Sequence, residues 1–480
     1  TAVAGNGAYF DRRWLPVVGY QPSLELSDEE ARRAQGLAPR PPTPSAHDAA
    51  ARRHRFELRD ADLVDIDAVV GTDEDQFAVT PGTLLREWRE NGRRYFHYRT
   101  EAPLSFGAPF LSAEYAVRED RWRDVALRIY HHPTHDFNLE RMLRSMKASL
   151  DYNSAQFGPY PFRELRIVEF PRYAGFARSH PHTIAYSEGS SFLTRVEEGD
   201  VDRTFFVTAH ETAHQWWGTQ VRGAGVEGGG FLSETLAQYS AMMVMEKTLG
   251  REQVRRFYDY EMDRYLRGRR VFTSREVPLL EVDRQAYLYY HKGAVAMYTL
   301  REHVGEERVN TALRRYLAKH RDAGPPYPTS LDLYAELRAV TPDSLRPLLR
   351  DLFEEITRWD VRADSARVEP AGSGGYRVTL HVVGRKVRAD SVGNETEVPM
   401  NDLVEVGVFA GAARDGGPGE PLYLRRHRVR GGAQTIVVTV PREPARAGID
   451  PYRRLIGRQG DDNLVDVAAA GAKGPGAPRR

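Results

Sequence analysis

The chain has 480 residues, of which 41% are hydrophobic and 28% are charged, with 68 Lys and Arg against 67 Asp and Glu. This composition predicts an ordinary globular protein of two to four domains, and the net charge of +1 gives no indication of a nucleic-acid or anionic-membrane partner. The absence of cysteine excludes disulfides, thiol catalysis and cysteine-ligated zinc, and the absence of a run of about eighteen apolar residues predicts no membrane span.

Residues 1–50 predict an extended N-terminal segment or linker. Ser27-Asp-Glu-Glu30 has the pattern of a capping box and predicts a short helix through Arg33. The proline-rich run 38–45 predicts a stiff connector, which would be either a linker or a strap on a domain surface. Because residue 1 is not Met and no signal-peptide pattern follows, we expect the chain to be a piece of a longer protein.

Residues 51–135 predict a β-rich domain, because the runs 94–99 and 125–130 are rich in aromatic and β-branched residues. Three histidines follow the second run, namely His131, His132 and His135. They have two interpretations, a second metal site or a turn from strand to helix. The turn is favoured because Asp136, the one nearby carboxylate, directly follows the last histidine and is suited to starting a helix.

Residues 136–360 predict a mostly helical domain. The segment from Asn138 to Phe157 carries apolar residues at helical spacing. Short strands are expected at 165–170 and 183–186, and a flexible glycine-rich loop at 223–230. Further helices are expected at about 203–218, 234–249 with Ser233 as N-cap, 251–267, 290–303, 307–321, 329–340 and 343–357.

Residues 361–456 predict a small β-sandwich, because the runs 376–383 and 434–440 alternate with period two between glycine-rich turns. Residues 457–480 predict a tail that is disordered at its Ala-, Gly- and Pro-rich end. The expected fold class is therefore multidomain α+β, with a β-rich N-terminal domain, a mostly helical central domain and a C-terminal β-sandwich. No internal repeat is present.

The central helical region contains an H-E-x-x-H motif, His210-Glu211-Thr-Ala-His214. Residues four apart lie on one face of a helix, so both imidazoles can reach one Zn²⁺ ion, and Glu211 is close enough to touch a water on that ion. A catalytic zinc needs a third protein ligand and one open position, and Glu234 is the candidate third ligand. The alternative is an exposed helix with solvated side chains, which the apolar flanking residues disfavour because buried His and Glu need partners.

Such a site would hydrolyse a peptide bond with a zinc-activated water. Glu211 would act as general base, and an oxyanion would need the zinc and one further donor. Tyr290 is a candidate donor, although it could equally be an aromatic residue packed in a helix. Gln238 could orient a ligand histidine or face solvent.

These motifs resemble the gluzincin metallopeptidases of the aminopeptidase N type, and more specifically the peptidase-like C-terminal domain fused to bacterial ABC transporter permeases. The segments that carry the second resemblance are 169–173, 181–188, 232–240 and 447–452. The resemblance extends from Tyr9 to about Val467 and implies a thermolysin-like catalytic domain between β domains. It implies His210, His214 and Glu234 as zinc ligands, Glu211 as base and Tyr290 as the residue that stabilises the transition state.

The sequence departs from that family in three ways. Nineteen residues separate His214 from Glu234, where the family usually has eighteen. Ser179 stands where the family has a Glu that binds the free amine of the substrate. We also expect the chain to lack the long helical C-terminal domain of the typical aminopeptidase. A less covered cleft would admit longer peptides.

The residues around Ser179 are candidates for substrate binding. Arg178, His180 and His182 could meet a substrate carboxylate or carbonyl, or they could form only a polar loop. Glu188 could substitute for the missing amine-binding Glu.

We therefore expect an aminopeptidase-like zinc metallopeptidase with one Zn²⁺ per chain, and leave exopeptidase or endopeptidase specificity open. The alternative is a zinc-containing peptide-binding or sensing module with little or no turnover; a purely structural zinc domain is weaker, since structural sites usually have four protein ligands. The resemblance implies a soluble chain at the extracytoplasmic, periplasmic face of a bacterial membrane. There it would belong to a larger membrane protein with an ABC permease part and its ATPase, and would act on a peptide or protein segment.

Overall fold

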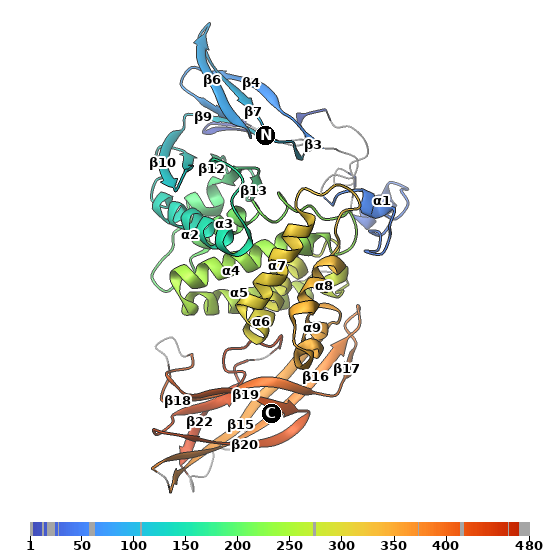
Figure 1. The fold of residues 1–480 in the computed structure, drawn as a ribbon, viewed down its shortest axis with the longest axis vertical. Helices are drawn as coiled ribbons and strands as arrows, with labels where there is room; N and C mark the ends of the chain where they lie inside the picture. Colours follow the sequence, from blue (N-terminus) through green and yellow to red (C-terminus); the bar gives the residue numbers. More distant parts are fainter. Residues whose placement is uncertain are drawn as a thin grey trace. The chain divides into compact units, whose positions relative to one another are not determined.

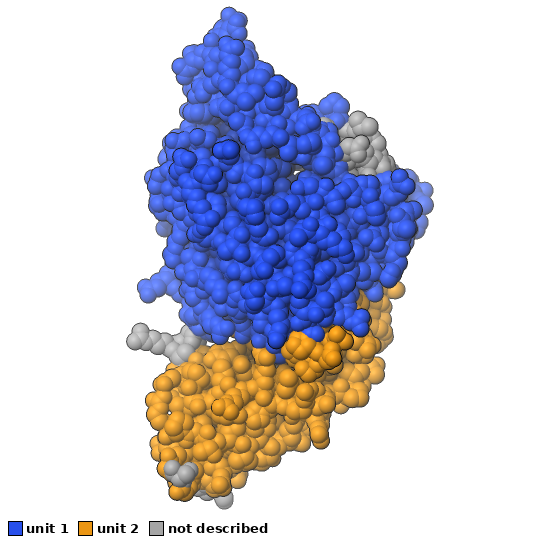
Figure 2. Space-filling model, viewed as in Figure 1, with its two compact units in different colours: residues 1–257, 280–341 blue, residues 258–279, 342–480 orange. Residues whose placement is uncertain are grey.

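The computed structural model describes residues 3–11, 14–16, 25–26, 28–56, 63–105, 108–271, 275–372, 374–412, 417–458 and 460–469. They form two compact units, which Figure 2 draws in two colours: residues 1–257 with 280–341, and residues 258–279 with 342–480. Ser27 of the predicted capping box and the predicted disordered end at 470–480 lie outside the described residues. Among the described residues, no helix combines the length and the apolar character needed to cross a membrane.

The N-terminal part of the first unit is β-rich, as predicted (Figure 1). A four-stranded sheet has the order β1-β2-β9-β5, a three-stranded sheet the order β4-β7-β6, and β3 pairs with β8. The strands are β1 (Val3–Ala4), β2 (Gly7–Phe10), β3 (Leu63–Val64), β4 (Asp67–Asp73), β5 (Phe77–Val79), β6 (Thr83–Glu90), β7 (Arg93–Arg99), β8 (Leu104–Ser105) and β9 (Phe110–Ala113).

The hairpin of β1 and β2 was not expected in the N-terminal segment. Its turn is Gly5-Asn6, and Tyr9 on β2 is buried and stacks on Phe170 with 4.5 Å between the ring centroids. Further along the segment, Asp28 caps the short helix α1 (Glu29–Ala34) by accepting a hydrogen bond from the backbone N–H of Ala31.

A five-stranded mixed sheet follows, in the order β10-β11-β12-β14-β13. Its members are β10 (Ala116–Trp122), β11 (Val125–His131), β12 (Glu164–Phe170), β13 (Ala177–His180) and β14 (Thr183–Ser187). Strands β11, β12 and β14 are parallel, and helix α2 (Leu139–Phe157) makes the crossover from β11 to β12. Strand β13 pairs with β14 in antiparallel orientation and forms one edge of the sheet.

The central part is helical, as predicted. Consecutive contacts join α2 to α3, α3 to α4, α4 to α6, α6 to α7 and α7 to α8, so these helices pack side by side (Figure 1). Thr329 and Asp332 form a capping box at the start of α8. The helices are α3 (Arg203–Ala213), α4 (Leu236–Leu249), α5 (Arg251–Val271), α6 (Gly293–Val304), α7 (Glu306–His320) and α8 (Ser330–Val340).

The glycine-rich loop 223–230 is closely packed, contrary to the expectation of a flexible loop. A Cβ on Gly229 would lie 2.2 Å from the ring of Phe56, and one on Gly228 would lie 2.3 Å from Ser330 Oγ. The backbone at His54 also contacts this loop, because Gly225 N–H donates a hydrogen bond to the carbonyl of His54 at 2.8 Å. The glycines therefore allow close approach of backbone and side chains.

The second unit contains helix α9 (Arg346–Phe353), part of α5 and a sheet of eight strands. The order is β17-β16-β15-β22-β21-β18-β19, and β20 pairs with β16. The strands are β15 (Thr357–Ala371), β16 (Gly375–Ala389), β17 (Glu395–Glu397), β18 (Asn401–Phe409), β19 (Pro421–Arg430), β20 (Gly432–Val440), β21 (Arg446–Ile449) and β22 (Leu464–Ala469). Strand β22 lies inside the predicted tail and joins β15 to β21, whereas a division into two facing sheets remains a prediction.

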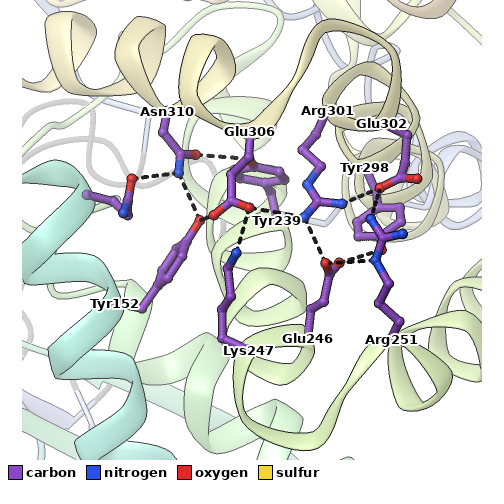
Figure 3. Close-up of polar contacts among 11 residues, drawn as sticks. Tyr152, Tyr239, Glu246, Lys247, Arg251, Tyr298, Arg301, Glu302, Glu306 and Asn310 are labelled. Atoms are coloured by element: carbon purple, nitrogen blue, oxygen red, sulfur yellow. Dashed lines mark hydrogen bonds and ion pairs between the residues drawn. The ribbon is translucent and has the colours of Figure 1, made fainter.

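Charged and phenolic side chains join α2, α4, α6 and α7 to the first residue of α5 (Figure 3). Arg301 on α6 contacts Glu246 at 2.8 Å and Glu306 at 3.1 Å, and it also pairs with Glu302. Arg301 and Glu246 are 6% and 7% exposed. Further contacts come from Lys247, Arg251, Tyr152, Tyr239, Tyr298 and Asn310.

We expect Arg301→Met to lower the free energy of unfolding by about 3–5 kcal/mol, because it leaves the carboxylate of Glu246 buried without its principal cation. Burial tends to raise the pKa of Glu246, but Tyr298 and Arg301 together hold it below its ordinary value of 4.5. A carboxyl with a lowered folded pKa stabilises the fold above the unfolded pKa, and this contribution is lost as pH falls through the folded pKa.

Urea denaturation between pH 3 and 7 measures both effects. The stability of the wild type should fall more steeply with acid than that of Arg301→Met. A control is Arg267→Met, which removes an exposed pair with Asp263 and should change stability by less than about 1 kcal/mol. Equal losses of unfolding free energy in Arg301→Met and Arg267→Met would contradict the conclusion that the ion pairs of Arg301 are buried.

Candidate metal centre

The two histidines of the motif come from the end of α3. Asp202 caps the start of this helix by accepting a hydrogen bond from Phe205 N–H at 2.9 Å. The helix ends at Ala213, five residues before the predicted end, and His214 is its C-cap with right-handed helical backbone angles. Because the backbone is still helical at His214, both rings remain on one face, and their Nε2 atoms are 3.1 Å apart.

Glu234 reaches these nitrogens from the π-helical turn η5 (Phe231–Thr235), which leads directly into α4. Its Oε2 atom lies 3.3 Å from Nε2 of each histidine. Ser233, the predicted N-cap, lies inside this turn instead. A π-helical turn contains one residue more than an α-helical turn, so η5 offers a place for the additional residue between His214 and Glu234.

The three atoms fit a zinc ion. Ligand distances of about 2.0–2.2 Å in a tetrahedron correspond to ligand–ligand separations of about 3.3–3.6 Å, close to the 3.1–3.3 Å between these atoms. Oε2 of Glu234 is buried and has no hydrogen-bond partner among the described residues. A buried carboxylate oxygen that faces two imidazole nitrogens is the arrangement expected where a cation completes the contacts.

The pKa values of Glu234 and His214 reflect the attraction between this carboxylate and the imidazoles. Burial would raise the pKa of Glu234, but the imidazoles of His214 and His210, whose Nε2 atoms lie 3.3 Å from its Oε2, lower it below its ordinary value. Burial would lower the pKa of His214, but the carboxylate of Glu234 raises it to about 9. Without a metal, the carboxylate therefore favours a proton on this histidine.

Backbone groups and a glycine orient the ligands. Nδ1 of His214 donates to the carbonyl of Trp217 at 2.9 Å, so this carbonyl, rather than Gln238, holds the ring and leaves Nε2 free for a metal. Gly218 has φ +99°, and a Cβ there would lie 3.0 Å from Oγ of Ser233. Glycine at this position therefore allows the turn that carries Glu234 to approach the histidines.

Glu211, between the two histidines, is buried with 6% exposure. Burial raises its pKa, whereas the charges of His210, His214 and Arg178 act in the opposite direction. Arg178 is therefore close enough for its charge to act on this carboxylate.

Tyr290 also lies at this site. It belongs to the π-helical turn η7 (Tyr287–Lys292), and its ring centroid is 6.0 Å from that of His210. Burial raises the pKa of its phenol, and the charge and hydrogen bond of Glu234 raise it further, so the O–H remains protonated at neutral pH. A Cβ on Gly293 would lie 2.3 Å from Oγ1 of Thr235, so this glycine lets the turns of Tyr290 and Glu234 pack together.

The four predicted substrate residues occupy different surroundings. Arg178 is exposed on β13, and His180 on the same strand has its pKa lowered to about 3 by burial and by Arg178. His182 packs against the ring of Phe162 and accepts a hydrogen bond from Gly82 N–H, so its ring faces protein atoms. The carboxylate of Glu188 accepts hydrogen bonds from the side chain of Asn6 at 2.6 Å and from the backbone N–H of Arg172 at 2.9 Å.

The histidines at 131–135 form the turn from β11 to α2, in agreement with the favoured interpretation. Glu169 accepts hydrogen bonds from His132 N–H and from Nδ1 of His135, both at 2.6 Å, and Glu188 lies nearby. A separation of 2.6 Å is that of a direct hydrogen bond and is shorter than the 3.1–3.3 Å between the zinc-site atoms. Glu169 therefore stabilises the turn through these two hydrogen bonds.

Sequence reasoning did not identify Gln215, which directly follows His214. Its side chain is fully buried and makes hydrogen bonds with Ser179, His180 and His182. The sequence offered one indication, the position of Gln215 directly after the motif, but an amide at that position could also have faced solvent.

The chain is similar to known proteins over its central part. Residues 138–341 match the family model described as "Peptidase family M1 domain". Human endoplasmic reticulum aminopeptidase 2 is 26% identical over 209 residues, which are 41% of this chain and 21% of that protein. The chain therefore spans about a fifth of the length of this curated relative.

Among solved structures, a match with a TM-score above 0.5 indicates a similar fold. Legionella pneumophila aminopeptidase A, in complex with aspartic acid, has a TM-score of 0.54 and 14% identity, over 86% of this chain and 45% of that one. An M1 zinc metallopeptidase from Deinococcus radiodurans has a TM-score of 0.48 and 18% identity, over 62% and 65%. Residues 138–341 are thus similar to the Peptidase family M1 domain.

Proposed function

We propose that this chain is a zinc-dependent, aminopeptidase-like metallopeptidase. His210, His214 and Glu234 would hold one zinc ion, Glu211 would be the general base, and Tyr290 would donate to the oxyanion. The observation that carries the proposal is the triangle of ligand atoms, 3.1–3.3 Å on each side, beside a buried carboxylate and a protonated phenol.

The roles follow from the chemistry of each group. Zinc, when bound, supplies a Lewis acid that polarises the scissile carbonyl and lowers the pKa of water. Glu211 accepts the proton of the attacking water and then delivers it to the leaving amine, so that the C–N bond breaks without formation of a free amide anion. Tyr290 donates its O–H to the oxygen of the scissile carbonyl as negative charge develops there.

Strand β13 is the natural place for the peptide backbone. It lies at the edge of its sheet, contacts α3, and carries Arg178, whose charge acts on Glu211. An extended peptide can pair with such an edge strand through main-chain hydrogen bonds. Arg178 would then meet a substrate carbonyl or carboxylate.

We expect Tyr290→Phe to lower kcat by about 10²–10³-fold and to leave KM nearly unchanged, because only the donor to the transition state is lost. The matched control is Tyr289→Phe. Tyr289 is a neighbouring half-buried tyrosine, 4.9 Å from Tyr290 between ring centroids, and its loss of a hydroxyl should change kcat by less than about threefold. Steady-state kinetics on one peptide separates the two variants, and equal effects would remove Tyr290 from the mechanism.

The specificity of cleavage depends on the amine of the substrate. Ser179 replaces the family's amine-binding Glu, and its Oγ accepts a hydrogen bond from Gln215 at 2.6 Å. Glu188 already accepts two hydrogen bonds from the protein. Both observations favour cleavage that does not require a free N-terminus.

The proposed activity is tested by incubating zinc-loaded protein with a mixed peptide library and identifying the products by mass. Cleavage by the wild type that is absent in Glu211→Gln supports the proposal. The product masses distinguish removal of single N-terminal residues from internal cleavage. One bound zinc with no cleavage of any peptide would favour the second candidate.

That second candidate is a zinc-containing peptide-binding or sensing module, favoured by Ser179 in place of the amine-binding Glu. The comparisons above name peptidases and aminopeptidases only. The fusion to an ABC permease with its ATPase and the extracytoplasmic placement therefore stay predictions from the sequence.

A further inference from the structure

We propose that Gln215 is a positioning residue that fixes edge strand β13 to the end of the zinc helix, so that the strand is held beside α3. The inference rests on the proposed function, because it assigns the peptide-binding strand of that function to one side chain. The contacts themselves are present whether or not the chain hydrolyses peptides.

The three hydrogen bonds of the Gln215 side chain all go to one segment of chain. Nε2 donates to Oγ of Ser179 at 2.6 Å and to the carbonyl of His180 at 2.9 Å. Oε1 accepts from the backbone N–H of His182 at 2.8 Å. A single amide therefore satisfies its donors and its acceptor on the last two residues of β13 and on the turn that follows.

The location of Gln215 makes this connection short. Gln215 is adjacent to the ligand His214, and its side chain has no measurable exposure. Among the described strands, β13 is hydrogen-bonded to a neighbour on one side, since it is the edge of its sheet. An edge strand is held less firmly than a central one, so a side chain that reaches it from the zinc helix sets its distance from the metal ligands.

The strand that Gln215 holds also packs against α3, the helix that carries the proposed general base. Arg178 lies on this strand between Ala177 and Ser179. Displacement of β13 would move Arg178 and the backbone edge together. Because the zinc ligands come from α3 and η5, such a displacement should weaken peptide binding without loss of the metal.

Two variants isolate the contacts. Gln215→Met keeps the length of the side chain and removes all three hydrogen bonds. Ser179→Ala removes one acceptor on the strand and leaves the buried glutamine in place. The control is Gln220→Met, which changes another buried glutamine of the same segment; its Nε2 donates to the backbone carbonyl of Gln215 and not to β13.

The first measurement is the steady-state kinetics of peptide hydrolysis with zinc content measured on the same samples. Gln215→Met should raise KM by at least about tenfold, with kcat changed by less than about threefold and one zinc retained. Ser179→Ala should raise KM by about two- to fivefold, and Gln220→Met should leave it unchanged. An unchanged KM in both Gln215→Met and Ser179→Ala would overturn the proposal.

The second measurement is amide hydrogen exchange, which does not depend on activity. Gln215→Met should speed exchange of residues 177–183 by at least about tenfold and leave residues 164–170 of β12 unchanged. If the wild type hydrolyses no peptide, the proposed function fails, and the exchange arm still decides whether Gln215 holds the strand. Unchanged exchange at 177–183, or faster exchange with an unchanged KM, would overturn the positioning role. If Gln215→Met fails to fold, Ser179→Ala decides both arms.

Discussion

Replacement of Glu211 by Gln is expected to lower kcat for peptide hydrolysis by about 10³-fold or more while the zinc stays bound. The amide has the same shape as the carboxylate but cannot accept a proton, so the water loses its base and the leaving amine its proton donor. Burial raises the pKa of Glu211, which brings this carboxyl closer to the range in which it can both take and return a proton.

The comparison needs a glutamate without a role in the reaction. Glu227→Gln meets this requirement, because Glu227 lies in the glycine-rich loop and belongs to neither group of candidate metal ligands among the described residues. Its activity should equal that of the wild type. Hydrolysis by Glu211→Gln at the wild-type rate would remove Glu211 from the mechanism, whatever the state of the metal site.

Removal of the third ligand should have a comparably large effect on metal binding. We expect Glu234→Ala to weaken zinc binding by more than about 10²-fold, because two neutral imidazoles then face the cation without a carboxylate; loss of a hydrogen-bond partner to a ligand already costs about 10–100-fold. Zinc competition with a chelator of known affinity measures the change.

The matched variant for Glu234→Ala is Glu188→Gln. Glu188 lies in the other His-Glu-Glu group, where a 2.6 Å hydrogen bond already joins His135 to Glu169. This variant should retain one zinc with unchanged affinity. Retention of tightly bound zinc by Glu234→Ala would show that the third ligand is another residue and that the one-residue difference in spacing had been assigned wrongly.

The convergence of His210, His214 and Glu234 was predictable because each of these residues has a local signature. The His210–His214 spacing needs only helical periodicity, and a helix-borne Glu after a short loop completes the donor set. The helices α2, α4, α6 and α7 were placed within a few residues by their apolar spacing.

The parts that sequence reasoning missed depend on contacts between distant segments. Ser233 lost its predicted N-cap role because the chain makes a π-helical turn there, and no simple periodicity marks such a turn. The packing of Gly229 against Phe56 joins segments more than 170 residues apart, so a run of glycines that suggests freedom is in fact the requirement for close contact. Gln215 was missed because its partners lie on another strand.

Two strands illustrate the same limit at the ends of the chain. Strand β2 carries Tyr9 against Phe170, and β22 joins β15 to β21. Both segments are short and lie in stretches whose composition suggests linkers. Strand pairing with a distant partner decided their structure, and composition does not report pairing.

The most direct test is a zinc titration of the metal-free protein in which bound metal and peptide cleavage are measured on the same samples. Cleavage should rise in proportion to bound zinc and reach its maximum at one equivalent per chain, and the same titration of Glu211→Gln should reach one equivalent without cleavage. One equivalent of tightly bound zinc without cleavage of any peptide, or cleavage that does not depend on zinc, would contradict a catalytic zinc held by His210, His214 and Glu234.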